Sequence, residues 1–117
     1  FEAERRIAAL GRAVDVTVLG MGNDGHTASF FPDADELDDL LDPAAPRSVA
    51  GVHAQSAGEP RLTLTLPPLI GAGFLALHIE GAEKKAILKP CAHSALKLKK
   101  TAYAGWVRAR RLRLFQP

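Results

Sequence analysis

Short apolar runs, separated by glycine, proline and charged residues, divide the chain into pieces of strand or short-helix length. Residues 14–19 are apolar at most positions, which is typical of a strand in a sheet that helices cover on both faces. Residues 61–66 alternate leucine with Arg61, Thr63 and Thr65, so they predict a strand with one leucine face. Further strands are expected over residues 48–53, 74–79 and 112–115.

Helical patterns lie between these strands. Residues 1–11 place Ile7 and Leu10 on one face and end at a glycine, and residues 35–41 place three leucines inward. Shorter or weaker helices are expected over 26–31, 67–70 and 102–109, a longer one over 84–98, and a flexible connector over 55–60. The alternation of strands and helices predicts a layered α/β fold with a largely parallel sheet and helices on both faces, with residues 14–19 as an interior strand.

The loop directly after the first strand concentrates polar and glycine residues. Gly20, Gly22 and Gly25 let the backbone turn sharply and approach a ligand closely. In open α/β sheets, small molecules bind outside the carboxyl ends of the strands, which is where this loop is expected. The loop is therefore the candidate active site.

Three groups in this loop have the chemistry of a hydrolytic site. A histidine imidazole can accept and donate a proton, so the side chain of His26 suits a general base. Asp24 either orients His26 or shapes the turn through hydrogen bonds to its own backbone. The backbone N–H groups around Gly22, Asn23 and Gly25 are candidates for holding an oxyanion or a phosphate.

A dinucleotide cofactor is the first alternative, because Gly20-x-Gly22-x-x-Gly25 has the glycine spacing of that fingerprint. The fingerprint needs a helix directly after it and then a strand that ends in an acidic residue. Residues 33–43 are acidic and have no strand pattern, so a nicotinamide or flavin cofactor is not favoured. Calcium is not favoured either, because this segment lacks the ordered ligand spacing of a calcium loop.

Residues 19–32, Leu-Gly-Met-Gly-Asn-Asp-Gly-His-Thr-Ala-Ser-Phe-Phe-Pro, resemble the signature loop of the 6-phosphogluconolactonases. The related glucosamine-6-phosphate deaminases share the Gly-x-Asp-Gly-His core but continue differently, so residues 27–32 favour the lactonase branch. The resemblance implies hydrolysis of 6-phospho-D-glucono-1,5-lactone in the pentose phosphate pathway, with no metal or organic cofactor and with His26 assisting attack by water. A sugar-phosphate isomerase or deaminase of the same fold and a non-catalytic sugar-phosphate-binding fragment stay open.

Two basic residues are candidate anchors for the substrate's phosphate. Arg61 lies in a segment that resembles the family's second motif, and a guanidinium binds phosphate through two parallel hydrogen bonds. Lys84 follows Gly81 in a segment that resembles a family turn at a helix start. One departure is Ser56, which stands near the place where many members carry a substrate-contacting lysine.

The resemblance covers essentially the whole chain, but only the C-terminal half of the family's usual domain. Residues 1–117 are therefore expected to be the C-terminal part of a single domain, and the chain alone is expected to be an incomplete enzyme. The single cysteine, Cys91, has no partner for an internal disulfide, and residues 1–12 lack the apolar core of a secretory signal. These features indicate a cytoplasmic protein.

The charge is divided unevenly along the chain. Residues 84–117 carry ten basic and no acidic side chains, whereas residues 1–83 carry all 13 acidic ones. A basic segment can bind nucleic acid, but no stacking pattern or nucleic-acid motif accompanies it, so no nucleic-acid partner is expected. No apolar run reaches the length of a membrane span, and the histidines show no metal-ligand spacing with one another or with Cys91. The expected partner is a phosphosugar lactone.

Overall fold

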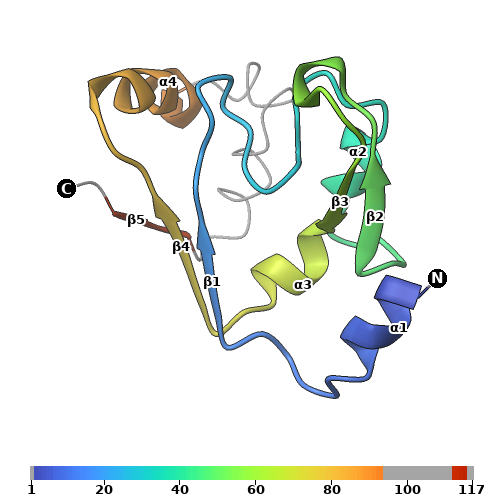
Figure 1. Ribbon diagram of the computed structural model, residues 1–117. Helices are drawn as coiled ribbons and strands as arrows, with labels where there is room; N and C mark the ends of the chain where they lie inside the picture. The colour runs from blue at the N-terminus through green and yellow to red at the C-terminus, as the bar shows by residue number, and fades with distance from the viewer. Residues whose placement is uncertain (1, 94–111, 116–117) are drawn as a thin grey trace.

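The computed structural model describes residues 2–93 and 112–115, which form an α/β fold with two sheets (Figure 1). A parallel sheet has the strand order β1-β4-β5, and a separate antiparallel pair joins β2 to β3. Figure 1 shows these two sheets on either side of α3. The strands are β1 (Val16–Leu19), β2 (Val49–Val52), β3 (Arg61–Leu64), β4 (Phe74–His78) and β5 (Leu112–Phe115). The predicted α/β class with a parallel sheet is confirmed.

The helices occupy most of the segments that the sequence predicted. They are α1 (Glu2–Ala8), α2 (Leu37–Leu40), α3 (Leu66–Ile70) and α4 (Ala82–His93). The expected flexible connector contains a 3₁₀ helix, Gln55–Ala57. The expected helical turn over residues 26–31 is wrong, because that segment forms turns instead. The predicted continuation of α4 to residue 98 and the helix over 102–109 lie outside the described residues.

The central strand of the described parallel sheet is β4, so the prediction that residues 14–19 form an interior strand is wrong for this part of the chain. Strand β1 pairs with β4, which pairs in turn with β5. Residues Leu75, Ala76 and Leu77 of β4 are buried, whereas Val16 and Val18 of β1 are 56% and 66% exposed. An apolar sequence run does not distinguish a face that the chain covers from one that it leaves open.

Burial along β3 and at Thr65, which follows it, is not uniform on either face. Leu62 is 57% exposed, whereas Thr63 and Thr65 are buried. The Thr65 hydroxyl donates a hydrogen bond of 2.6 Å to the Arg47 carbonyl, and the Thr63 hydroxyl donates one of 3.1 Å to the Leu64 carbonyl. A threonine can be buried when its hydroxyl has such a partner, and Leu66 is buried as well, at 2% exposure.

A single hydrophobic core joins the two sheets. It draws side chains from β1, β2, β4, the three helices α2, α3 and α4, and the loop that follows β1. Phe30 and Phe31, from that loop, belong to it. The buried members are Leu19, Met21, Phe30, Phe31, Leu37, Leu40, Val52, Leu66, Leu69, Leu75, Leu77, Ile79 and Leu88.

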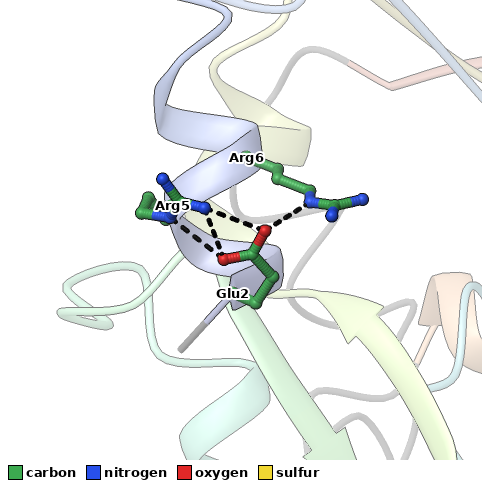
Figure 2. Close-up of polar contacts among 3 residues, drawn as sticks. All are labelled: Glu2, Arg5 and Arg6. Carbon is green, nitrogen blue, oxygen red and sulfur yellow. Dashed lines mark hydrogen bonds and ion pairs between the residues drawn. The ribbon is translucent and has the colours of Figure 1, made fainter.

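Local ion pairs stabilise the exposed helix α1. Figure 2 shows the Glu2 carboxylate between two guanidinium groups, with Arg5 Nη2 at 2.7 Å and Arg6 Nε at 2.6 Å. The hydrogen bonds from Arg6 and then Arg5 lower the pKa of Glu2. Pairs three and four residues apart on a helix support it, although solvent weakens pairs that are as exposed as these.

A carboxylate, rather than an apolar face, attaches α1 to the rest of the fold. The Glu4 carboxylate accepts hydrogen bonds of 2.8 Å from the backbone N–H groups of both Ser48 and Val49, at the start of β2. Ile7 and Leu10, the predicted apolar face, are 38% and 67% exposed. The two hydrogen bonds of the Glu4 carboxylate therefore attach α1 to the start of β2.

A second carboxylate connects the start of α2 to the end of β2. Glu36 accepts a hydrogen bond of 2.9 Å from the His53 backbone N–H, and its other oxygen lies 2.6 Å from His53 Nδ1. The hydrogen bonds from His53 lower the pKa of Glu36, and the hydrogen bond to Glu36 raises the pKa of His53. The pair is strongest when Glu36 is ionised and His53 is protonated.

This pair predicts a pH-dependent contribution to stability. The Glu36 contribution is present above its ordinary pKa of 4.5 and is lost as the pH falls through the lowered value. The His53 contribution is fully present below its ordinary pKa of 6.5 and is lost as the pH rises through the raised value. We therefore expect His53→Gln to lower the melting temperature most between these two limits and less at higher pH. Thermal unfolding of both proteins across a pH series measures this, and a difference that stays constant above neutral pH would contradict it.

Candidate active site in the loop after strand β1

The loop that follows β1 closes on itself through backbone hydrogen bonds. The Gly25 N–H donates to the Gly22 carbonyl at 3.0 Å, and the Gly22 N–H donates to the His26 carbonyl at 2.9 Å. Gly25 has φ of +84°, in the left-handed region that glycine adopts without strain. In this conformation both N–H groups donate within the loop, and their role in holding an oxyanion or a phosphate stays a prediction.

Asp24 both shapes the turn and contacts the imidazole, so the two sequence-based alternatives for this residue occur together. Its Oδ1 accepts a hydrogen bond of 3.0 Å from the His26 backbone N–H, two residues ahead, and lies 2.5 Å from His26 Nδ1. A carboxylate can only accept, so this contact places a proton on Nδ1. In the neutral imidazole, Nε2 then carries the free lone pair and is the basic nitrogen.

Gly22 leaves the space that the imidazole occupies. A Cβ atom at this position would lie 2.3 Å from His26 Cε1, 2.4 Å from His26 Nδ1 and 2.9 Å from Asp24 Oδ1. These distances are far below van der Waals contact. The glycine is therefore required here by the side chains of Asp24 and His26, and not only by the turn.

The ring of Phe31 covers one face of the His26 imidazole. The two ring centroids are 4.3 Å apart and the planes are inclined by 27°. The Phe31 side chain is buried in the core, whereas the His26 side chain is 29% exposed. The loop therefore places a solvent-accessible imidazole against a fixed aromatic surface.

A cavity of about 500 Å³ adjoins His26 at the carboxyl end of β1. Lys84 reaches the cavity from α4, which follows β4, and in Figure 1 the loop after β1 and α4 lie at the same end of the parallel sheet. Lys84, one of the two candidate phosphate anchors, thus lines the same cavity as His26, and its binding of phosphate stays a prediction. The lining residues are Val18, Leu19, Gly20, Met21, Gly22, His26, Ala28 and Lys84.

Two other candidates lie away from the lining of this cavity. Arg61 Nη2 donates a hydrogen bond of 3.1 Å to the Ala57 carbonyl, and Arg61 Nη1 lies 3.4 Å from the Glu59 carboxylate. Asn23 is exposed at the tip of the turn. Substrate binding by these two residues stays a prediction.

Ser56, which stands near the place of the family's lysine, has a structural contact. Its backbone N–H donates a hydrogen bond of 2.9 Å to Asp33, and its hydroxyl donates one of 2.5 Å to the other carboxylate oxygen. These contacts lower the pKa of Asp33. Ser56 therefore attaches the 3₁₀ helix to the segment that follows the candidate site.

Three features of this site were not predicted from the sequence. The stacking of Phe31 on His26 has no signal in the sequence, because a phenylalanine at this position is equally expected for burial in the core alone. Ala28 lines the cavity and has a φ of +50°. This left-handed conformation is uncommon for alanine, so the residue type gives no signal for it. Met21 lines the cavity while it is buried, and its position directly after the strand was the available signal.

Within residues 2–93 and 112–115, no cluster of three or more His, Cys, Asp or Glu side chains could hold a metal ion. None of the helices in that part of the chain has the length and apolar character needed to cross a membrane.

The sequence and the fold of this chain are both similar to those of known proteins. A family profile described as glucosamine-6-phosphate isomerases/6-phosphogluconolactonase matches residues 2–113. The chain belongs to this family. Its relatives in the family include the 6-phosphogluconolactonase of Mesorhizobium japonicum, 71% identical over 72 residues, which are 62% of this chain and 30% of that protein. That of Rhizobium meliloti is 57% identical over 86 residues, which are 74% of this chain and 37% of that protein.

The family's solved structures share the fold. The 6-phosphogluconolactonase from Shewanella baltica superposes with a TM-score of 0.79 at 29% identity, covering 98% of this chain and 51% of that one. The Neisseria gonorrhoeae protein described as a 6-phosphogluconolactonase gives a TM-score of 0.73 at 30% identity, covering 90% and 46%. The chain thus spans about a third of the length of these curated relatives and about half of these solved structures.

The space around Gly22 gives a direct test of the site's geometry. We expect Gly22→Ala to displace the His26 imidazole, because the new Cβ atom overlaps its Cε1 and Nδ1. The proton on Nδ1, which is hydrogen-bonded to Asp24, should give a downfield NMR resonance that the variant loses. Gly51→Ala is the matched control, because no atom lies within 4 Å of the Cβ at that position. Retention of the resonance in Gly22→Ala would show that the loop accommodates the methyl group.

Proposed function

We propose that this chain forms the catalytic part of a 6-phosphogluconolactonase, which hydrolyses 6-phospho-D-glucono-1,5-lactone to 6-phosphogluconate in the pentose phosphate pathway. The observation that carries the proposal is the Asp24–His26 pair beside a cavity that Lys84 also lines. This pair lies in the loop that resembles the lactonase signature. The relatives named 6-phosphogluconolactonase, up to 71% identical, support the same activity.

In the proposed reaction, His26 acts as a general base. Asp24 keeps the proton on Nδ1, so Nε2 removes a proton from a water molecule as the water oxygen attacks the lactone carbonyl carbon. The tetrahedral intermediate then expels the ring oxygen, which takes the proton from the imidazolium. One water molecule is consumed, the ester bond is broken, and a carboxylic acid and an alcohol are formed. The acid then ionises.

Lys84 is proposed to hold the phosphate of the substrate. Its side chain lines the same cavity as His26, near the start of α4, where the helix dipole also favours an anion. Arg61 remains a second proposed anchor, and it would have to leave Ala57 and Glu59 to reach a ligand. The backbone N–H groups around Gly22, Asn23 and Gly25 remain proposed donors to an oxyanion or a phosphate.

The chain is proposed to be the C-terminal part of one larger domain. The exposed valines Val16 and Val18 support this, because an apolar strand face of this kind normally packs against other residues. A chimera provides the complete domain for testing: this chain replaces the region that it matches in the Mesorhizobium japonicum 6-phosphogluconolactonase. The cytoplasmic location stays a prediction.

The first functional prediction concerns the base. In the chimera, His26→Asn should lower kcat by about 10²-fold or more, the usual scale for a positioned general base. Binding of 6-phosphogluconate should change much less, because the imidazole transfers a proton and does not anchor the phosphate. Lactone hydrolysis is followed by the release of acid, with the spontaneous rate subtracted at each pH.

The 117-residue chain by itself serves as a second sample in that experiment, and little activity is expected from it. Turnover of the His26→Asn chimera at the parent rate would remove His26 as the base and leave Asp24 as the next candidate. An inactive parent chimera that still binds 6-phosphogluconate would instead support the non-catalytic sugar-phosphate-binding alternative.

The second functional prediction separates the two anchors. Lys84→Ala should raise KM by about tenfold or more, the scale of a lost charge-assisted hydrogen bond, with a small change in kcat. Arg61→Ala should raise KM less, because the guanidinium is paired with Ala57 and Glu59 in the free protein. If Arg61→Ala has the larger effect, the phosphate anchor belongs on β3.

A sugar-phosphate isomerase or deaminase is the second candidate, because the family profile includes glucosamine-6-phosphate isomerases. The same chimera distinguishes the activities when it is assayed for ammonia release from glucosamine 6-phosphate. Hydrolysis of the lactone without release of ammonia supports the lactonase, and the reverse result supports the alternative.

A further inference from the structure

We infer that Phe31 is a positioning residue for His26, which fixes the plane of the imidazole and so directs Nε2 toward the substrate. The inference rests on the proposed function, because it assigns Phe31 a role in the same reaction. The observation is the stacked contact between the two rings, with centroids 4.3 Å apart and planes inclined by 27°.

The hydrogen bond to Asp24 does not fix the imidazole by itself. It restrains the position of Nδ1, at 2.5 Å from the carboxylate oxygen, but it leaves the ring able to tilt about that contact. A flat surface against one face of the ring removes this freedom. Asp24 and Phe31 together therefore determine where Nε2 lies, while the missing Cβ of Gly22 leaves room for the ring edge.

Phe31 is suited to this task because the core holds it. Its side chain is 7% exposed and belongs to the main hydrophobic cluster. The backbone after it is also fixed, since the Ala34 N–H donates a hydrogen bond of 3.0 Å to the Phe31 carbonyl. One part of the ring is thus packed in the core, and the other part provides the surface on which His26 rests.

Aromatic stacking also explains why a flat ring, rather than an aliphatic side chain, serves here. Offset stacked rings attract each other beyond the burial of their surface, and the π-face remains favourable when the imidazole becomes an imidazolium during proton transfer. The His26 side chain is still 29% exposed and lines the cavity, so part of it is accessible to water and substrate.

The test compares kcat and KM in the chimera. Phe31→Leu keeps an apolar side chain but loses the flat surface, and we expect kcat to fall by about three- to tenfold with KM changed less than about twofold. Phe31→Tyr keeps the ring and should restore most of the loss. Leu40→Ala is the control for core damage: it truncates a fully buried residue of α2 that does not line the His26 cavity, and it should leave kcat near the parent value. All variants are assayed at a temperature at which circular dichroism shows them folded.

A double substitution shows whether Phe31 acts through His26. In the His26→Asn background, Phe31→Leu should cause no further loss of kcat, because there is no imidazole left to position. An equal loss of kcat in both backgrounds, or in Phe31→Leu and Leu40→Ala, would overturn the inference and assign Phe31 to the core alone.

NMR spectroscopy of the 117-residue chain tests the contact independently of activity. The ring current of Phe31 should shift the carbon-bound imidazole protons of His26 upfield, and Phe31→Leu should return them toward the values of an unstructured histidine. An inactive parent chimera would contradict the proposed function, and this NMR comparison would still decide the inference. Imidazole resonances that do not respond to Phe31→Leu would overturn it.

Discussion

The burial of Phe30 and Phe31 is the constraint on which the geometry of the candidate site depends. Burying a phenylalanine side chain contributes about 1.5–3 kcal/mol, more than any single polar contact in the exposed loop. Leu19, at the end of β1, belongs to the same core, so the loop is anchored by packing at both ends. The residues between these anchors have little freedom, and His26 is therefore placed by the core as much as by its own hydrogen bonds.

Carboxylates hold the outer segments where apolar contacts are few. Glu4, Glu36 and Asp33 each accept a hydrogen bond from the backbone N–H of a residue distant in the sequence, and Asp24 does the same two residues ahead. Backbone N–H groups outside helices and sheets need acceptors, and an ionised carboxylate is a strong one. Glu4, Asp33 and Glu36 therefore have structural roles. This accounts for an α1 helix that remains attached although its apolar side chains are exposed.

The sequence predicted the parts of the fold that depend on local pattern. The alternation of strands and helices identified a parallel sheet, and the glycine and polar residues after β1 identified the loop that contains His26. The sequence did not predict burial where the same pattern is compatible with a covered face and with an open one. The valines of β1 look the same whether a face is covered or open, and the alternation in β3 does not show that Thr63 and Thr65 have acceptors for their hydroxyls. The contact of Phe31 with His26 depends on tertiary packing and has no sequence periodicity.

The position of the two basic residues follows from strand direction. Strands β1 and β4 are parallel, with Leu19 opposite Leu77, so the segments that follow them emerge at the same edge of the sheet. This brings α4, and with it Lys84, to the loop of His26. Arg61 begins β3, which pairs with β2 in a different sheet and makes its contacts near Ala57. The basic residue farther from His26 in the sequence therefore shares its cavity, because the carboxyl ends of neighbouring parallel strands form a common site whatever the length of chain between them.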